Sequence, residues 1–165
     1  MRSSAMEQDT SRGPGVRIHP PILYLTPLLL GYIVQHFMPI HIVTGARPAR
    51  ILDVVGAAEI FIGVSLATWA VATLRRLKTP IVPVRPASTL AAEGPFTLTR
   101  NPIYLSFSLI YLGITFVTNA FWPLLFLPEA MVLTYLLAIK PEEAHLAREF
   151  GDAYTEYCKR VRRWV

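Results

Sequence analysis

Apolar residues gather in four long runs along the chain, and polar or charged residues separate these runs. A helix that crosses a bilayer needs about 20 mainly apolar residues, because each residue adds about 1.5 Å along the helix axis. The runs cover residues 22–40, 51–74, 102–118 and 121–139, so each comes near membrane length. We therefore predict an all-α, polytopic membrane protein with four transmembrane helices.

The third and fourth runs are separated only by Asn119 and Ala120, which predicts a tight hairpin. A hairpin of two spans returns its outer ends to the same face of the membrane. The polar sequence before residue 102 and the polar sequence after residue 139 are therefore expected to meet at one face, where they can form a site.

Residues 141–161 have the pattern of an amphipathic helix. Proline suits the first turn of a helix, and Pro141 takes that position. Apolar and aromatic residues then recur at helical spacing, at Leu146, Phe150, Tyr154, Tyr157 and Val161. We expect this helix to lie at the cytosolic surface, against the membrane or over the mouth of the helix bundle.

Composition and charge support a membrane protein. Hydrophobic residues make up 53% of the 165 residues, above the roughly 45–50% of soluble domains. Residues 1–18 are polar and predict a disordered lead-in, and residues 19–165 predict one membrane domain. The formal charge of +5 comes largely from Lys and Arg beside the spans, which favours lipid headgroups over nucleic acid as partners.

The positions of Lys and Arg also predict an orientation. They cluster before the first run, between the second and third, and after the fourth, whereas the opposite loops hold only Arg47 and Arg50. Loops rich in Lys and Arg stay on the cytoplasmic side. We expect a multi-pass protein with both termini in the cytoplasm, in a bacterial inner membrane. The scattered histidines and the single cysteine predict no metal site.

Candidate chemistry lies at the start of the third run. Arg100 can bind a carboxylate or phosphate through two parallel hydrogen bonds, and Asn101 offers donors and an acceptor. Tyr104 offers a ring and a hydroxyl. The same residues also suit a structural interpretation, with an arginine reaching lipid headgroups, a capping asparagine and an interfacial tyrosine.

Two adjacent acids open the predicted cytosolic helix. Glu143 falls in the middle of the apolar stripe, so its carboxylate needs a partner. Glu142 falls at the margin, where an acid in the first turn favours the positive helix N-terminus.

Polar residues inside the spans favour structural roles. One side of the third span carries hydroxyl groups at Tyr104, Ser108, Tyr111, Thr115 and Thr118, which predicts hydrogen bonds between helices. Glu59 and Glu129 are expected at a similar depth of about 12 Å, near Tyr111, and predict a structural network. Gly56 and Gly63 predict a close helix contact on the second span.

Several short motifs follow one another around the predicted hairpin. They are Thr79 and Pro83, Gly94-Pro95-Phe96, Arg100-Asn101-Pro102-Ile103-Tyr104-Leu105, Glu142-Glu143, Phe150-Gly151 with Tyr154 and Tyr157, and Arg160 to Arg163. In this order and spacing, the chain resembles the isoprenylcysteine carboxyl methyltransferase family and its bacterial relatives, which include phospholipid methyltransferase-like membrane proteins. The resemblance covers about residues 79–164.

The resemblance implies a methyltransferase that binds S-adenosylmethionine at the cytosolic face, releases S-adenosylhomocysteine and modifies a lipophilic or lipid-linked acceptor. It implies catalytic roles for Arg100, Asn101, Tyr104 and Glu143. It implies cofactor binding by Arg100, Asn101, Pro102, Tyr104, Glu142, Glu143, Tyr154 and Tyr157. The family commonly has histidine where this chain has Asn101, and glycine where it has Ser106, which leaves the acceptor open.

Two other functions remain open at this point. Some sterol-type reductases have a similar C-terminal architecture, so an NADPH-dependent membrane reductase is one alternative. A membrane adaptor or transport subunit is the other, and there Glu59 and Glu129 would matter more than the cytosolic motifs. The sequence leaves open the acceptor atom and the oligomeric state.

Overall fold

The computed structural model describes residues 19–80 and 89–164. Within these ranges the long elements are all helices, so the all-α prediction is confirmed there. The elements are α2 (Pro20–Phe37), α3 (Ala46–Arg76), the 3₁₀ helix η1 (Gly94–Thr97), α4 (Pro102–Val117), α5 (Phe121–Thr134), the π-helix η2 (Tyr135–Ile139) and α6 (Lys140–Arg160). The predicted polar lead-in 1–18 and Pro83 lie outside the described residues.

Two of the described helices are long and apolar enough to cross a membrane. They are α3, with 31 residues, and the helical stretch Phe121–Arg160, with 40 residues. Helix α4 is apolar but has only 16 residues. Large apolar side chains such as Val54 and Phe61 are exposed on α3, as expected of a surface that faces lipid. The helices therefore indicate a membrane protein, while the four-span topology remains a prediction.

Helix α5 continues through η2 into α6, although the sequence suggested one helix ending at residue 139 and another beginning at 141. Proline lacks an N–H and its ring clashes with the carbonyl four residues earlier. The π-helical turn Tyr135–Ile139 comes directly before Lys140 and Pro141. Its wider hydrogen-bond spacing lets the helix pass the proline without a break.

The chain divides into two compact units, described in turn. One contains, among the described residues, parts of Thr68–Pro102 and of Tyr135–Val165. The other contains Pro20–Ala67 and Ile103–Thr134. We call them the motif unit and the hairpin unit. The first contains residues 100–102, the start of the motif at residues 100–105 (the first motif below), and Glu142-Glu143 (the second motif below); the second contains the turn between α4 and α5.

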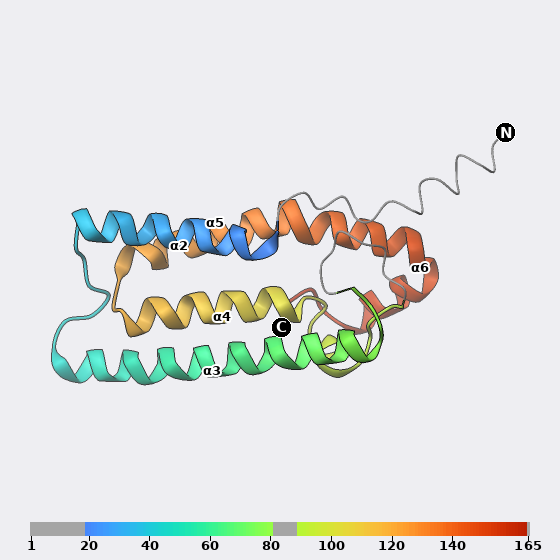
Figure 1. The fold of residues 1–165 in the computed structure, drawn as a ribbon, viewed down its shortest axis with the longest axis horizontal. Coiled ribbons are helices and arrows are strands. Elements are labelled where there is room, and N and C mark those ends of the chain that lie inside the picture. The colour runs from blue at the N-terminus through green and yellow to red at the C-terminus, as the bar shows by residue number, and fades with distance from the viewer. Residues whose placement is uncertain (1–18, 81–88, 165) are drawn as a thin grey trace. The chain divides into compact units, whose positions relative to one another are not determined.

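In the hairpin unit, glycines allow helices to approach closely. Helix α2 lies along α5 (Figure 1), and a Cβ on Gly31 would come within 2.6 Å of Pro123 Cα. A Cβ on Gly56 of α3 would lie 2.6 Å from the Gly113 carbonyl oxygen of α4, and one on Gly63 would lie 2.9 Å from the Ser106 carbonyl oxygen. Gly56 and Gly63 thus confirm the predicted close contact on α3.

Hydroxyl groups join the helices of the hairpin unit, as the polar stripe on α4 predicted. The Tyr24 hydroxyl of α2 lies 2.9 Å from Ser108 Oγ. The Tyr111 hydroxyl donates to the Pro123 carbonyl oxygen of α5 at 2.8 Å. The Tyr32 hydroxyl lies 2.6 Å from Thr118 Oγ1. Hydrogen bonds therefore link α4 to both α2 and α5.

Among the described residues, the predicted network of Glu59, Glu129 and Tyr111 is not formed by hydrogen bonds between these side chains. Tyr111 gives its hydroxyl hydrogen to the backbone of Pro123, and the side chain of Glu129 is exposed. Within the described residues, the buried Oε2 of Glu59 has no hydrogen-bond partner. A shared depth is not sufficient for a hydrogen bond between two side chains, because the rotation of each helix sets the direction of its side chains, and the spacing along one helix does not determine that rotation.

In the motif unit, α6 bends sharply at Gly151. This residue has φ 49° and ψ −121°, inside a helix that otherwise runs from Lys140 to Arg160. After the bend, Tyr154, Tyr157 and Val161 form a buried cluster that packs against Leu90, Leu146 and Phe150. The predicted apolar stripe is thus partly covered by its own unit, and a position of α6 on the membrane surface remains a prediction.

Gly151→Ala is expected to destabilise the protein through its backbone alone. A side chain in this region of φ and ψ costs about 1–3 kcal/mol, and a Cβ at position 151 would meet no other atom within 4 Å. We expect a lower thermal midpoint in detergent. Glu149→Ala, two residues earlier at an exposed helical position, is the control and should keep the wild-type midpoint. A Gly151→Ala midpoint equal to wild type would contradict the strained bend.

Candidate active site

The first motif follows a fixed loop in the motif unit. Gly94 has φ 60°, and a Cβ there would lie 2.8 Å from Thr73 Oγ1, so the position favours glycine. Pro95 and Phe96 are buried after it. The Tyr157 hydroxyl donates to the Phe96 carbonyl oxygen at 2.7 Å. This hydrogen bond fastens the loop to the second half of α6.

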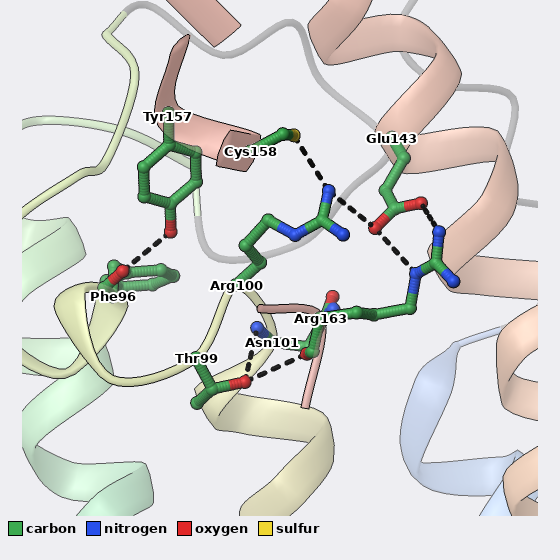
Figure 2. Close-up of polar contacts among 8 residues, drawn as sticks. All are labelled: Phe96, Thr99, Arg100, Asn101, Glu143, Tyr157, Cys158 and Arg163. Carbon is green, nitrogen blue, oxygen red and sulfur yellow. Dashed lines mark hydrogen bonds and ion pairs between the residues drawn. The ribbon is translucent and has the colours of Figure 1, made fainter. Parts of the chain in front are cut away.

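Arg100, Glu143 and Arg163 form a cluster of opposite charges, which we call the Arg–Glu–Arg cluster (Figure 2). Arg163 Nε and Nη2 donate to the two carboxylate oxygens of Glu143 at 2.9 and 2.8 Å. Arg100 Nη1 lies 3.4 Å from Glu143 Oε1. The side chains of Arg100 and Glu143 are only 15% and 17% exposed. The structure thus places Arg100 of the first motif against Glu143 of the second.

The charges in this cluster stabilise one another. Hydrogen bonds to the Glu143 carboxylate raise the pKa of Arg163. Two guanidinium groups share one carboxylate, so the cluster carries one positive charge in excess. Removing one partner of a charge pair of low exposure strongly destabilises a folded protein, because the charge of the other partner is left uncompensated. The inward-facing Glu143 therefore has the partner that its sequence position required.

The segment after α6 lies across the first motif. The Arg100 N–H donates to the Arg162 carbonyl oxygen at 2.9 Å. The Arg163 carbonyl oxygen accepts from Thr99 Oγ1 at 2.9 Å and from Asn101 Nδ2 at 3.0 Å. Thr99 Oγ1 in turn accepts from the Asn101 N–H at 3.2 Å. Three of these hydrogen bonds join residues 99–101 to residues 162–163, and the fourth lies within residues 99–101.

Asn101 and Pro102 are both buried. The Asn101 side chain uses its amide group to hold the backbone of the following segment, and Pro102 begins α4. An amide does not accept a proton at neutral pH, so Asn101 is unsuited to act as a general base. In this structure it fixes the position of the loop that carries Arg100.

Tyr154 and Tyr157 lie beside the cluster. Their ring centroids are 6.2 Å apart. Burial raises the pKa of Tyr157 to about 12. Burial also raises the pKa of Tyr154, and the neighbouring Cys158 and Glu143 raise it further. Both hydroxyls therefore remain protonated at neutral pH. Arg100 Nη1 also donates to Cys158 Sγ at 2.7 Å.

The other two predicted site residues are placed differently. Glu142 is half-buried at the start of α6. Tyr104 belongs to the hairpin unit, where it is buried and its carbonyl oxygen accepts from the Tyr24 hydroxyl at 3.2 Å. The motif unit therefore holds Arg100, Asn101, Pro102, Glu142, Glu143, Tyr154 and Tyr157, while the place of Tyr104 in the site remains a prediction.

The sequence interpretation did not assign several of the contacts. It did not pair Arg163 with Glu143, and it gave no role to Thr99 or Cys158. The Arg163 guanidinium also lies 5.1 Å from the centre of the Tyr135 ring. An arginine close to a membrane is usually a headgroup contact, and nothing in the order of residues marks Arg163 as the partner of Glu143. Among the described residues, no three His, Cys, Asp or Glu side chains are grouped to hold a metal ion.

The described part of the chain therefore combines helices of membrane length with a cluster of charged side chains in the motif unit. A family model described as phospholipid methyltransferase matches residues 52–153. This range is more than half of the chain, and the chain belongs to this family of methyltransferases. The match confirms the predicted resemblance and includes Arg100 and Glu143. No curated protein and no solved structure matches the chain.

Proposed function

We propose that this protein transfers a methyl group from S-adenosylmethionine to a lipophilic or lipid-linked acceptor at the cytoplasmic face of the membrane. The Arg–Glu–Arg cluster is the observation that carries the proposal. It joins the two motifs of a methyltransferase family in one compact unit. The orientation rests on the distribution of Lys and Arg, which favours cytoplasmic termini and a cytoplasmic loop before α4.

The residues of the cluster fit the chemical groups of S-adenosylmethionine. The surplus positive charge suits the carboxylate of this cofactor. Buried polar groups usually have hydrogen-bond partners, which can be water or a ligand. Within the described residues, Arg100 Nε and the Tyr154 hydroxyl are buried without a partner. Both are donors, so both can hold an anionic or hydroxyl group of the cofactor.

Each residue of the cluster then has a distinct task. Arg100 would hold the cofactor's carboxylate, since its Nε is still unpaired. A carboxylate offers about four acceptor positions, so Glu143 can take the cofactor's ammonium or ribose hydroxyl groups beside its two bonds from Arg163. Glu142 is a second candidate for these groups. The rings of Tyr154 and Tyr157 are candidates for contact with adenine or the sulfonium cation.

When bound, S-adenosylmethionine would supply a methyl group on a sulfonium: a bond from the acceptor to the methyl carbon forms as the carbon–sulfur bond breaks, and S-adenosylhomocysteine is the leaving group. Asn101 cannot remove a proton from the acceptor, so an acceptor that is already a carboxylate fits this chain well. Its residues would then act by aligning the two reactants and excluding water. Alignment contributes up to about 7–11 kcal/mol in favourable cases.

Calorimetric titration of the detergent-purified full chain with S-adenosylhomocysteine tests this function. We expect saturable binding at one site per chain. NADPH is titrated in parallel, and we expect no binding because the function requires none. A folded protein that binds NADPH but not S-adenosylhomocysteine would be a reductase instead. A folded protein that binds neither would overturn the enzymatic proposal.

A further inference from the structure

Arg163 lies outside residues 52–153, the range that matches the methyltransferase family, yet its guanidinium donates to both carboxylate oxygens of Glu143 (Figure 2). We propose that Arg163 is a positioning residue, which holds the Glu143 carboxylate in the orientation that cofactor binding requires. This inference rests on the proposed function.

The side chain of Arg163 fixes the plane of the Glu143 carboxylate. Two N–H groups of one guanidinium, Nε and Nη2, reach the two oxygens in parallel at 2.9 and 2.8 Å. Such a pair specifies direction as well as distance, because both groups are planar. A single ammonium group cannot impose the same orientation. The remaining acceptor positions of Glu143 are therefore held in a defined direction.

The guanidinium itself is held from two further directions. Its Cζ lies 5.1 Å from the centre of the Tyr135 ring, close enough for an attraction between the cation and the ring. Tyr135 is the first residue of η2, so the π-helical turn helps to place it. The backbone of Arg163 is fixed by Thr99 and Asn101, which both donate to its carbonyl oxygen. Arg163 thus connects α6 to the loop before α4.

The two arginines of the cluster are not equivalent. Arg100 has one contact with Glu143, at 3.4 Å, donates to Cys158 and keeps a buried Nε without a partner among the described residues. Arg163 directs its Nε and its Nη2 at the two carboxylate oxygens of Glu143. This difference assigns ligand contact to Arg100 and orientation of the carboxylate to Arg163.

A double-mutant cycle with Arg163→Gln and Glu143→Gln tests the inference, with the dissociation constant of S-adenosylhomocysteine as the readout. We expect Arg163→Gln to weaken binding by about tenfold or more, as for other residues that orient a ligand-binding side chain. Because Arg163 acts through Glu143, the double variant should bind no more weakly than Glu143→Gln alone. Arg163→Lys should not restore the affinity, since lysine lacks the paired donors.

Lys159→Gln is the matched control, because it also removes one positive charge from α6. Lys159 is exposed and pairs with Glu156 at the surface. We expect its affinity and thermal midpoint to equal those of wild type. If Arg163→Gln does not fold, Tyr135→Leu gives the second measurement. This variant removes the ring beside the guanidinium but keeps the hydrogen bonds of Arg163 with Glu143, Thr99 and Asn101. It should weaken the binding of S-adenosylhomocysteine by a smaller factor.

The outcomes separate the two proposals. Two results would overturn the role of Arg163 and leave the proposed function intact. One is an equal affinity of Arg163→Gln and Lys159→Gln for S-adenosylhomocysteine. The other is a double variant whose loss of binding free energy equals the sum of the losses of the two single variants. A third result is an affinity of the variants that falls only where the thermal midpoint falls and that Arg163→Lys restores. That result would show that Arg163 stabilises the fold and does not orient the Glu143 carboxylate for binding. A folded wild-type chain that binds no S-adenosylhomocysteine would overturn both proposals.

Discussion

Glu143→Ala is expected to abolish cofactor binding, with a loss of affinity for S-adenosylhomocysteine of about 100-fold or more, equivalent to about 2.8 kcal/mol. The substitution removes the carboxylate proposed to bind the cofactor. It also leaves Arg100 and Arg163 close together without the group that neutralises them. Calorimetric titration measures the affinity, and methyl transfer from labelled S-adenosylmethionine to membrane lipids measures the activity.

Glu149→Ala is the control for this prediction. Glu149 also lies on α6 but is exposed. The Glu149→Ala variant should bind S-adenosylhomocysteine with the affinity of wild type. The thermal midpoint of each variant shows whether the protein remains folded. Because the cluster is partly exposed, the loss in free energy of unfolding should be below the roughly 3–5 kcal/mol found when a fully buried pair is broken. A folded Glu143→Ala variant with wild-type affinity would exclude Glu143 from the site.

Gly113→Leu is expected to disrupt the hairpin unit. A Cβ at this position would lie 2.5 Å from the Gly56 carbonyl oxygen and 2.7 Å from Ile60 Cγ1. The first contact is with backbone, so α3 and α4 must move apart to admit a side chain. Added volume in a packed interior typically costs about 1–3 kcal/mol, and a four-carbon side chain against backbone should reach or exceed the upper end. The thermal midpoint in detergent measures this loss.

Ala57→Leu provides the comparison, because it also adds volume to α3 but at an exposed position. We expect it to leave the midpoint unchanged, since an added apolar side chain there faces lipid or detergent. Gly113→Ala should fall between the two. Equal midpoints for Gly113→Leu and Ala57→Leu would show that α3 and α4 do not approach each other at Gly56.

The helices could be located from the sequence because hydrophobic length is a local property. The four apolar runs correspond to α2, α3, α4 and α5 with η2. The continuity from α5 to α6 could not be found in this way. It depends on the π-helical turn before Pro141, and a pattern of apolar residues does not reveal which hydrogen bonds the backbone makes. The bend at Gly151 escaped the prediction for the same reason.

The candidate site was predicted in part. The sequence placed Glu143 on the buried side of its helix and expected the two motifs to meet, and the structure puts Arg100 beside Glu143. It could not select Arg163 from the basic residues near the end of the chain, since all are equally plausible headgroup contacts. Nor could it foresee that Asn101 would bind the Arg163 carbonyl oxygen, because that requires the segment after α6 to return to the loop.

The sequence by itself determined the helical class, the membrane-length apolar segments, the close glycine contact on α3 and the family. Each follows from neighbours along one helix or from the order of motifs, which folding does not alter. Only the tertiary structure decided that no hydrogen bond joins Glu59 and Glu129 among the described residues. It also decided that Arg163 Nε and Nη2 donate to the Glu143 carboxylate. Those outcomes depend on helix rotation and on a chain segment that returns after a bend, and both are set by packing between residues far apart in the chain.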